Sequence, residues 1–153
     1  MIAAHGTFSE IVVIRLDPGE DVFEGILRYC KEHAIKNGVL LALHGSLKKA
    51  SFFNVVPKPD LAMQYGYTDP MILDDICELI GGSGTVTHEE DGTINIHVHC
   101  SYSDRGGKAW GGHLIPGNEV LLVAEIMIGV VKGAEMLGIR NETGGVLFTP
   151  VQL

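Results

Sequence analysis

Short apolar segments bounded by turn residues dominate this chain and predict a fold built mainly from β-strands. SEIVVIRL (9–16) reads as one such strand, and EVLLVAEIMIGVV (119–131) is a longer apolar run with one charge, Glu125, near its middle. The glycines of CELIGGSGTVT (77–87) predict a bulge within a strand. Other strands are expected at residues 38–45, 49–56, 93–102, 107–114, 134–139 and 145–151. The first two of these flank a short connection and predict a hairpin.

One segment departs from the strand pattern and predicts a single main helix. Its apolar residues recur at helical spacing, so that one face points inward; they are Val22, Phe23, Ile26, Leu27, Cys30 and Ala34. We expect Asp17 as the N-cap, Pro18 at the first helical position and Glu20 completing a capping box. Asn37-Gly38 is expected to end the helix. Many strands and one helix together predict an α+β architecture with a mixed, mostly antiparallel sheet.

The pattern also predicts how the chain is organised. Residues 57–75 contain three prolines and read as a long loop, which in a compact domain often serves function or an interface. No repeat or linker-like stretch divides the 153 residues. We therefore expect one domain over residues 8–151, preceded by a short N-terminal tail, residues 1–7.

Composition narrows the classes of partner. The formal net charge is −8, from 11 basic and 19 acidic residues. Binding to phosphate backbones depends on Lys and Arg, so nucleic acid is a disfavoured partner. The nearest approach to a basic patch is Lys48-Lys49 and the pair Arg105 and Lys108, both expected to be solvated surface.

Localisation is predicted from the apolar runs and the cysteines. The longest apolar runs are too short to cross a bilayer, and the N-terminus lacks the pattern of a signal peptide. Cys30, Cys77 and Cys100 are odd in number and widely spaced, so we expect free thiols rather than disulfides or a cysteine zinc site. These observations predict a soluble protein of the cytoplasm.

The clearest chemical signal is the segment HVHCSYSDRGGKAWGGHL (97–114). His97 and His99 share one face of a strand, with Cα atoms about 6.6 Å apart. The turn at 103–107 would bring His113 back beside them, and Gly111 and Gly112 permit a close backbone approach or leave room for a ligand. Three histidines with an open fourth position are typical of a catalytic zinc site. The alternative is a polar solvent face, and the third histidine favours the metal.

Two further residues are candidate catalytic groups, Glu125 and Arg140. A carboxylate within an apolar strand needs a partner, because an unpaired buried charge is costly. Glu125 is therefore expected to orient a histidine of the metal site, to act as a general base, or to form an ion pair with Arg140. His44, which precedes Gly45-Ser46, is expected to be structural, although it could line the same pocket.

The histidine and glycine segment resembles the signature of the plants-and-prokaryotes-conserved (PPC) domain. Further matching segments follow in order along the chain: DPGEDVFEGI (17–26), HGSLKKASF (44–52), ELIGGSGTV (78–86), EIMIGVVKG (125–133) and RNETGG (140–145). The resemblance covers residues 9–148. It implies an α+β fold related to acetolactate decarboxylase, a homotrimer, and zinc ligands at His97, His99 and His113.

The resemblance also has implications for function. It implies a metal-dependent role toward a small molecule, as a sensor or as an enzyme of the lyase or decarboxylase type, with zinc or another divalent transition metal as cofactor. Plant members of the family carry a basic AT-hook that binds DNA, and this chain has no such segment. A DNA-binding module and a structural trimer without catalysis are the alternative functions.

Overall fold

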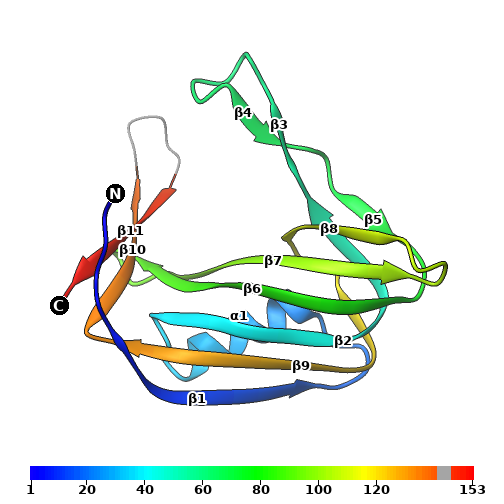
Figure 1. The fold of residues 1–153 in the computed structure, drawn as a ribbon, viewed down its shortest axis with the longest axis horizontal. Helices are drawn as coiled ribbons and strands as arrows, with labels where there is room; N and C mark the ends of the chain where they lie inside the picture. Colours follow the sequence, from blue (N-terminus) through cyan, green and yellow to red (C-terminus); the bar gives the residue numbers. More distant parts are fainter. Residues whose placement is uncertain (141–145) are drawn as a thin grey trace.

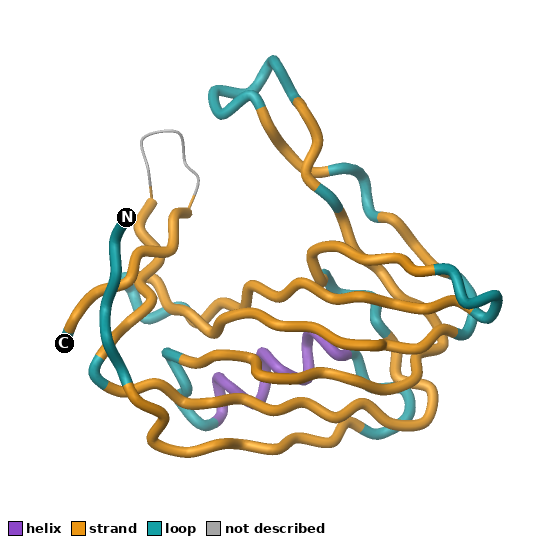
Figure 2. The backbone as a smooth tube through the Cα atoms, viewed as in Figure 1, coloured by secondary structure: helices purple, strands orange, loops and turns teal. Residues whose placement is uncertain are grey.

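The computed structural model describes residues 1–140 and 146–153. In the described residues a large bent sheet carries one helix on one of its faces, and a narrow hairpin projects from the body (Figures 1 and 2). The helix is α1 (Val22–Glu32). The strands are β1 (Thr7–Leu16), β2 (Gly38–Phe53), β3 (Val55–Pro57), β4 (Tyr65–Tyr67), β5 (Met71–Leu73), β6 (Cys77–Glu89), β7 (Ile94–Asp104), β8 (Ala109–Leu114), β9 (Glu119–Lys132), β10 (Ala134–Arg140) and β11 (Val146–Gln152).

The main sheet has the order β1-β9-β2-β8-β7-β6-β10-β11, with β5 attached to β2 and a further pairing of β2 with β6. Every pairing of named strands is antiparallel except that of β10 with β6. The predicted fold class, α+β with a mixed, mostly antiparallel sheet and one helix, is confirmed. The implied relationship to acetolactate decarboxylase stays a prediction.

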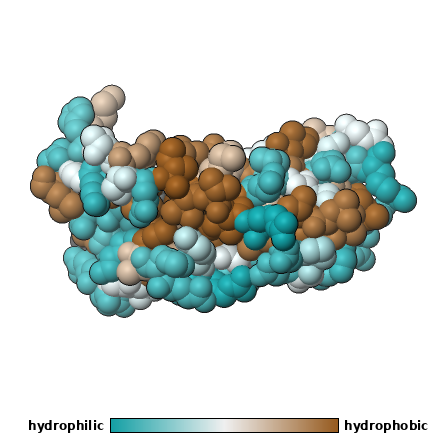
Figure 3. Space-filling view, turned by 90° about the horizontal axis from the view of Figure 1, so that it is seen from below, coloured by the Kyte–Doolittle hydropathy of each residue, from teal (hydrophilic) through white to brown (hydrophobic). Residues whose placement is uncertain are grey.

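The core lies between α1 and the face of the sheet that the helix covers, which we call the inner face. Val22, Ile26 and Cys30 of α1 are fully buried there. They pack with buried strand residues such as Leu43 and Ile126. The opposite face of the sheet, the outer face, carries no helix (Figure 1). It exposes several apolar side chains of the edge strand β1. Figure 3, which views the molecule from below at the β1 edge, shows hydrophobic residues gathered there.

The helix begins later than the sequence pattern predicts. Its N-cap is Asp21, whose carboxylate accepts a hydrogen bond from the backbone N–H of Glu24. The expected contact between Asp17 and Glu20 does form, because the side chain of Glu20 accepts a hydrogen bond from the backbone N–H of Asp17. This contact closes a turn before the helix and does not cap the helix itself. Gly19 explains the difference, because its φ of +89° is incompatible with a helix.

The helix also ends earlier than predicted, at Glu32 instead of Asn37. The N–H of Ile35 bonds to the carbonyl of Cys30, and the N–H of Ala34 bonds to that of Lys31. These two bonds make a Schellman motif, in which the residue that leaves the helix adopts left-handed backbone. Here that residue is Ala34, with a φ of +52°, and not a glycine.

The predicted hairpin at residues 38–56 is wrong, because β2 is one continuous strand. Gly45, expected near the turn, is extended and pairs with Leu79 on one side and Ala124 on the other. A Cβ on Gly45 would lie 2.3 Å from the carbonyl oxygen of Val123. Glycine is therefore present for the close approach of β2 and β9, and bulges bend the strand where a turn was expected.

Two further predictions from the sequence concern β6 and residues 57–75. The glycine bulge in β6 is confirmed, as a register shift between Leu79 and Gly81. The expected loop at 57–75 contains strand structure, because β3 and β4 form the projecting hairpin and β5 joins the main sheet (Figure 1). Within the described part of the chain, no helix has the length and apolar character needed to span a membrane.

Candidate metal centre

Strand alternation places two of the three predicted histidines on the outer face of the sheet. Ile96, Val98 and Cys100 of β7 are buried toward the core. His97 and His99 between them therefore point outward, His97 half-buried and His99 exposed. Cys100 faces away from the histidines, toward the core. Burial raises the pKa of its thiol to about 12, so the thiol stays protonated at neutral pH.

The return of the chain to His113 depends on Asp104. One oxygen of its carboxylate accepts hydrogen bonds from the backbone N–H groups of Gly106 and Lys108, and the other accepts one from the indole of Trp110. The indole bond and the backbone bonds hold the pKa of this carboxyl below its usual range. The turn between β7 and β8 closes over Gly107, whose φ is +78°. The DRGGKAW segment is thus a turn stabilised by its first residue.

The two glycines before His113 allow β8 to lie close to its neighbours. A Cβ on Gly111 would lie 2.8 Å from the carbonyl oxygen of Cys100, and one on Gly112 would lie 2.7 Å from that of Phe53. Of the two roles considered for these glycines, the structure shows the close backbone approach. As a result His113 pairs directly with His99 of β7 and with Phe53 of β2.

The three imidazoles converge on one point of the outer face. The Nε2 atoms of His97 and His99 are 3.1 Å apart. One ring nitrogen from each of His97, His99 and His113 lies within 4.8 Å of the other two. Ligands at 2.0–2.1 Å from a tetrahedral ion are separated by about 3.4 Å, so modest rotations of these rings would bring all three to one zinc ion. The donor set therefore fits a divalent transition metal.

The surroundings keep two of these imidazoles neutral. Burial lowers the pKa of His113 to about 4, with smaller contributions from His97 and His99. The pKa of His97 is lowered as well, first by burial and then by His99. A metal ligand must be a neutral imidazole, so both residues can bind an ion at neutral pH without first losing a proton.

Aromatic side chains from distant strands hold the ring of His113, and the sequence analysis missed them. Phe53 of β2 stacks on this ring with centroids 4.7 Å apart and planes inclined by 17°. Tyr67 of β4 lies 4.1 Å from the ring of Phe53 and 5.7 Å from that of His113. Neither had a local signal, because Tyr67 stands in the segment expected to be loop and Phe53 in an ordinary strand pattern.

Two cavities open beside the histidines. A small one of about 210 Å³ lies among the three histidines, Phe53 and Tyr67. A larger one of about 690 Å³ extends from His97 and His113 toward β10 and β11. Its walls include the apolar side chains of Met136, Leu147 and Phe148, the last with its ring 6.0 Å from that of His97. A small molecule could therefore reach an ion held by the triad.

The structure does not bring Glu125 to this site. Glu125 is half-exposed on β9, and its Oε2 lies 2.8 Å from Nε2 of His44 on β2. Strand β2 pairs with β9 on one side and with β6 on the other, and β6 pairs with β7. The distance from β9 to β7 across these three strand spacings is therefore about 14 Å. The expectation that Glu125 is buried is wrong, and its histidine partner is not a member of the triad. The side chain of Arg140 lies outside the described residues.

Residues 3–132 match the family model of the Plants and Prokaryotes Conserved (PCC) domain. The chain belongs to this family. The resemblance found in the sequence, under the name PPC domain, is thereby confirmed, although most of the RNETGG segment lies outside the described residues.

Solved structures share the fold of this chain. A plant- and prokaryote-conserved protein of Pyrococcus horikoshii is 25% identical, with a TM-score of 0.81 and 100% of both chains covered. A metal-containing protein of Archaeoglobus fulgidus is 21% identical, with a TM-score of 0.81 over 97% of this chain and 99% of that one. A candidate DNA-binding protein of Bacteroides thetaiotaomicron is 14% identical, with a TM-score of 0.74 over 94% and 96% of the two chains.

Among curated proteins, the PPC domain of this chain resembles part of two much longer ones. These are the bifunctional GlmU proteins of Synechococcus strains JA-3-3Ab and JA-2-3B'a(2-13), each 31% identical over 115 and 119 residues. The matches cover 75% and 78% of this chain. This chain spans about a sixth of the length of those relatives, 16% in each case.

Proposed function

We propose that this PPC domain binds one divalent transition-metal ion, zinc foremost, through His97, His99 and His113, and that the ion is the centre of a small-molecule site. The observation that carries the proposal is the convergence of three ring nitrogens within 4.8 Å, two of them 3.1 Å apart. A metal-containing protein of the same fold in Archaeoglobus fulgidus supports it.

The chain's own residues would bind, orient and shield the ion and its ligand. Three protein ligands leave a fourth position open, and the cavities beside the triad give access to it. Phe53 and Tyr67 restrict water on one side of His113. The ion would supply Lewis acidity or an activated water. A decarboxylase-like lyase acting on a carbonyl or carboxylate compound, or a sensor of such a compound, are the two forms of this function.

Elemental analysis of protein purified without chelator or nickel tests the metal site. We expect about one equivalent of metal in the native protein and less than about a tenth in His97→Ala and His113→Ala. His44→Ala is the matched control, because His44 is an outer-face histidine paired with Glu125 away from the triad. Less than about a tenth of an equivalent in the native protein, unchanged in the two variants, would refute the proposal.

We further propose a homotrimer with the histidine site near a subunit boundary. The support is the apolar surface of edge strand β1, where Phe8, Ile11 and Val13 are 50%, 60% and 67% exposed. Monomers seldom expose a large apolar patch, and identical chains usually cover one by closed symmetry. Three subunits follow from the family resemblance. A monomer mass from light scattering at micromolar protein would exclude the trimer and the boundary site.

DNA binding is the rival function, and its support is the candidate DNA-binding protein of the same fold. Three of the four basic groups considered above are engaged within this chain. Lys48 pairs with Glu119 at 2.6 Å, Arg105 with Asp75 at 2.9 Å, and Lys108 lies over the ring of Trp110. Duplex binding at physiological salt that weakens steeply as salt rises would favour this rival.

A cytoplasmic location completes the proposal. Its support is the state of the three cysteines, which are free and buried. Free thiols persist in a reducing compartment. Fractionation of the native host that places the protein outside the cytoplasm would exclude this part of the proposal.

A further inference from the structure

The cavity beside the triad adjoins a second cavity on the outer face. This second cavity has a volume of about 490 Å³ and reaches β1 at Phe8. Thr85 and Met136 line both cavities. These two side chains therefore stand between the two cavities, and a route from one to the other would start at His97 and His113 and pass them.

The strand register gives this path a direction. His97 of β7 pairs directly with Thr85 of β6, Thr85 with Val39 of β2, and Val39 with Gly129 of β9. Directly paired residues share a face, so the four form a row across the outer face. With strands about 4.8 Å apart, Val39 lies about 10 Å from His97 and Gly129 about 14 Å from it. Gly129 has no side chain, and the ring of Phe8 lies over it.

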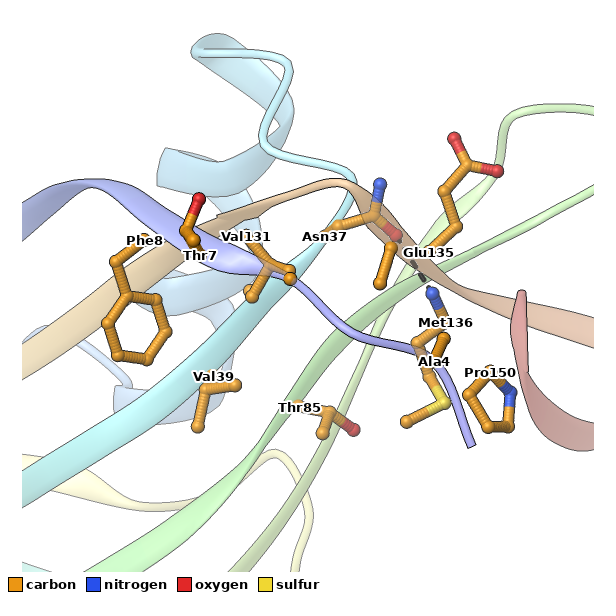
Figure 4. Close-up of a pocket in the computed structure, with 13 residues that line it drawn as sticks. Ala4, Thr7, Phe8, Asn37, Val39, Thr85, Val131, Glu135, Met136 and Pro150 are labelled. Atoms are coloured by element: carbon orange, nitrogen blue, oxygen red, sulfur yellow. Dashed lines mark hydrogen bonds between the residues drawn. The ribbon is translucent and has the colours of Figure 1, made fainter. Parts of the chain in front are cut away.

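The chemistry changes along this row. Beside the histidines, the first cavity includes the polar side chains of Thr85 and Asn95. The second cavity is walled mainly by Phe8, Val39, Val131, Met136 and Pro150. Figure 4 shows the end of the Met136 side chain directed toward Thr85 and the carboxylate of Glu135 directed away from the cavity. The first cavity thus combines the histidines and Asn95 with apolar walls, whereas the far end at Phe8 and Val39 is almost wholly apolar.

Met136 is suited to stand at the junction. Its backbone N–H donates to Oδ1 of Asn37 at 3.1 Å, which fixes the main chain of β10 there. Its side chain is unbranched and adapts its shape easily. A flexible thioether over Thr85 can move aside for a chain that passes from one cavity to the other.

The charge at the triad selects the head group of a ligand. Three neutral imidazoles leave the two positive charges of a bound zinc ion uncompensated, which favours an anion in the open position. The nearest carboxylate in the larger cavity is Glu89, four residues along β6 from Thr85 and about 13 Å away. Its side chain accepts a hydrogen bond from Asn95 at 3.2 Å. Asn95 thus holds the carboxylate of Glu89, which keeps this acidic group engaged away from the open position of the ion.

We propose that this site binds an aliphatic monocarboxylate, with the carboxylate at the ion held by the histidines and the chain passing Thr85 and Met136 into the apolar cavity. The inference rests on the proposed metal site and adds the ligand class. An unbranched chain fits the row of side chains better than a bulky group, because it would have to pass the two side chains that the cavities share.

The test is a titration of zinc-loaded protein with acetate, butyrate, hexanoate and octanoate, followed by ligand-observed NMR. Burial of each added methylene should raise affinity about threefold to fourfold. Val39→Trp should remove this gain for hexanoate and octanoate and leave acetate unchanged, because Val39 lines only the apolar cavity. Val39→Thr, which keeps the side-chain shape, should weaken octanoate binding by about twofold to fourfold. Ile72→Trp on exposed β5 is the control for an added indole.

The outcomes separate the two proposals. Zinc at one equivalent with no dependence of affinity on chain length overturns the ligand class and leaves the metal site standing. Failure to retain zinc overturns the proposed function itself. If Val39→Trp binds octanoate as tightly as the native protein, the route into the apolar cavity is overturned. If that variant instead alters only the mass found by light scattering, the cavity is a contact between copies of the chain, and the route is likewise overturned.

Discussion

Zinc binding in acid should depend on the burial of one imidazole, and Phe53→Ala tests this. Phe53 stacks on the ring of His113, and burial is the main cause that lowers the pKa of His113 to about 4. Truncation of Phe53 exposes the imidazole and should return its pKa toward the ordinary 6.5. A more basic imidazole is protonated in mild acid, where the proton competes with the metal.

The magnitude follows from the two pKa values. At pH 5.5 an imidazole with a pKa near 4 is almost wholly neutral and leaves metal affinity unchanged. One with a pKa of 6.5 is about nine-tenths protonated at that pH and lowers affinity about tenfold. At pH 8 both are neutral. We therefore expect Phe53→Ala to lose up to about tenfold in zinc affinity at pH 5.5 and little at pH 8.

The assay is competition for zinc with a chelator, run on native and variant protein in parallel so that the chelator's own pH dependence cancels. Phe53→Leu is the control, since leucine retains apolar cover without the aromatic stack. Circular dichroism verifies that each variant is folded. An equal loss at both pH values would refute the reasoning, because it would mean that Phe53 positions the ring rather than desolvating it.

Three predictions concern stability. Ala34→Gly should raise the free energy of unfolding by about 1 kcal/mol in urea denaturation, since Ala34 has a φ of +52° that glycine adopts without strain; no gain would contradict the Schellman assignment. Gly84→Ala should separate β6 from β7 and abolish zinc binding, because a Cβ there would lie 2.1 Å from the carbonyl oxygen of His97. Gly81→Ala is the control: a Cβ there would lie 4.0 Å from the nearest atom, so this variant should have the melting temperature and zinc binding of the native protein. Asn118→Ala should cost about 3 kcal/mol by thermal unfolding, because the buried amide bonds to four groups; a loss under 1 kcal/mol would show that water replaces it.

The pKa of His113 also has a consequence for the metal-free protein. Its folded pKa of about 4 is below the ordinary 6.5 of an unfolded chain. The unfolded state therefore takes up the proton first as pH falls. The contribution to stability is fully present above pH 6.5 and is lost as the pH falls toward 4. Metal-free protein should accordingly melt at a lower temperature at pH 5 than at pH 7, and His113→Phe should reduce that difference.

The sequence alone determined the elements that depend on local pattern. Short apolar segments and turn residues identified β1, β6, β7, β8 and β9, and the DRGG turn was sufficient to predict that His113 returns beside His97 and His99. Such features are readable because side chains alternate strictly along a strand and a short turn limits where the chain can go. The family resemblance rests on the same local segments.

The tertiary structure decided what depends on neighbours distant in sequence. Gly45 looked like a turn residue, but β9 and β6 pair on both sides of it and keep β2 extended. Glu125 looked buried because its strand is apolar, yet it points to the uncovered outer face and pairs with His44. Phe53, from a strand that ends more than forty residues before the triad, sets the burial of His113. Local sequence determines whether a segment has the periodicity of a strand or of a helix. Which face of a strand is buried, and which side chains it contacts, is determined by contacts across the whole sheet.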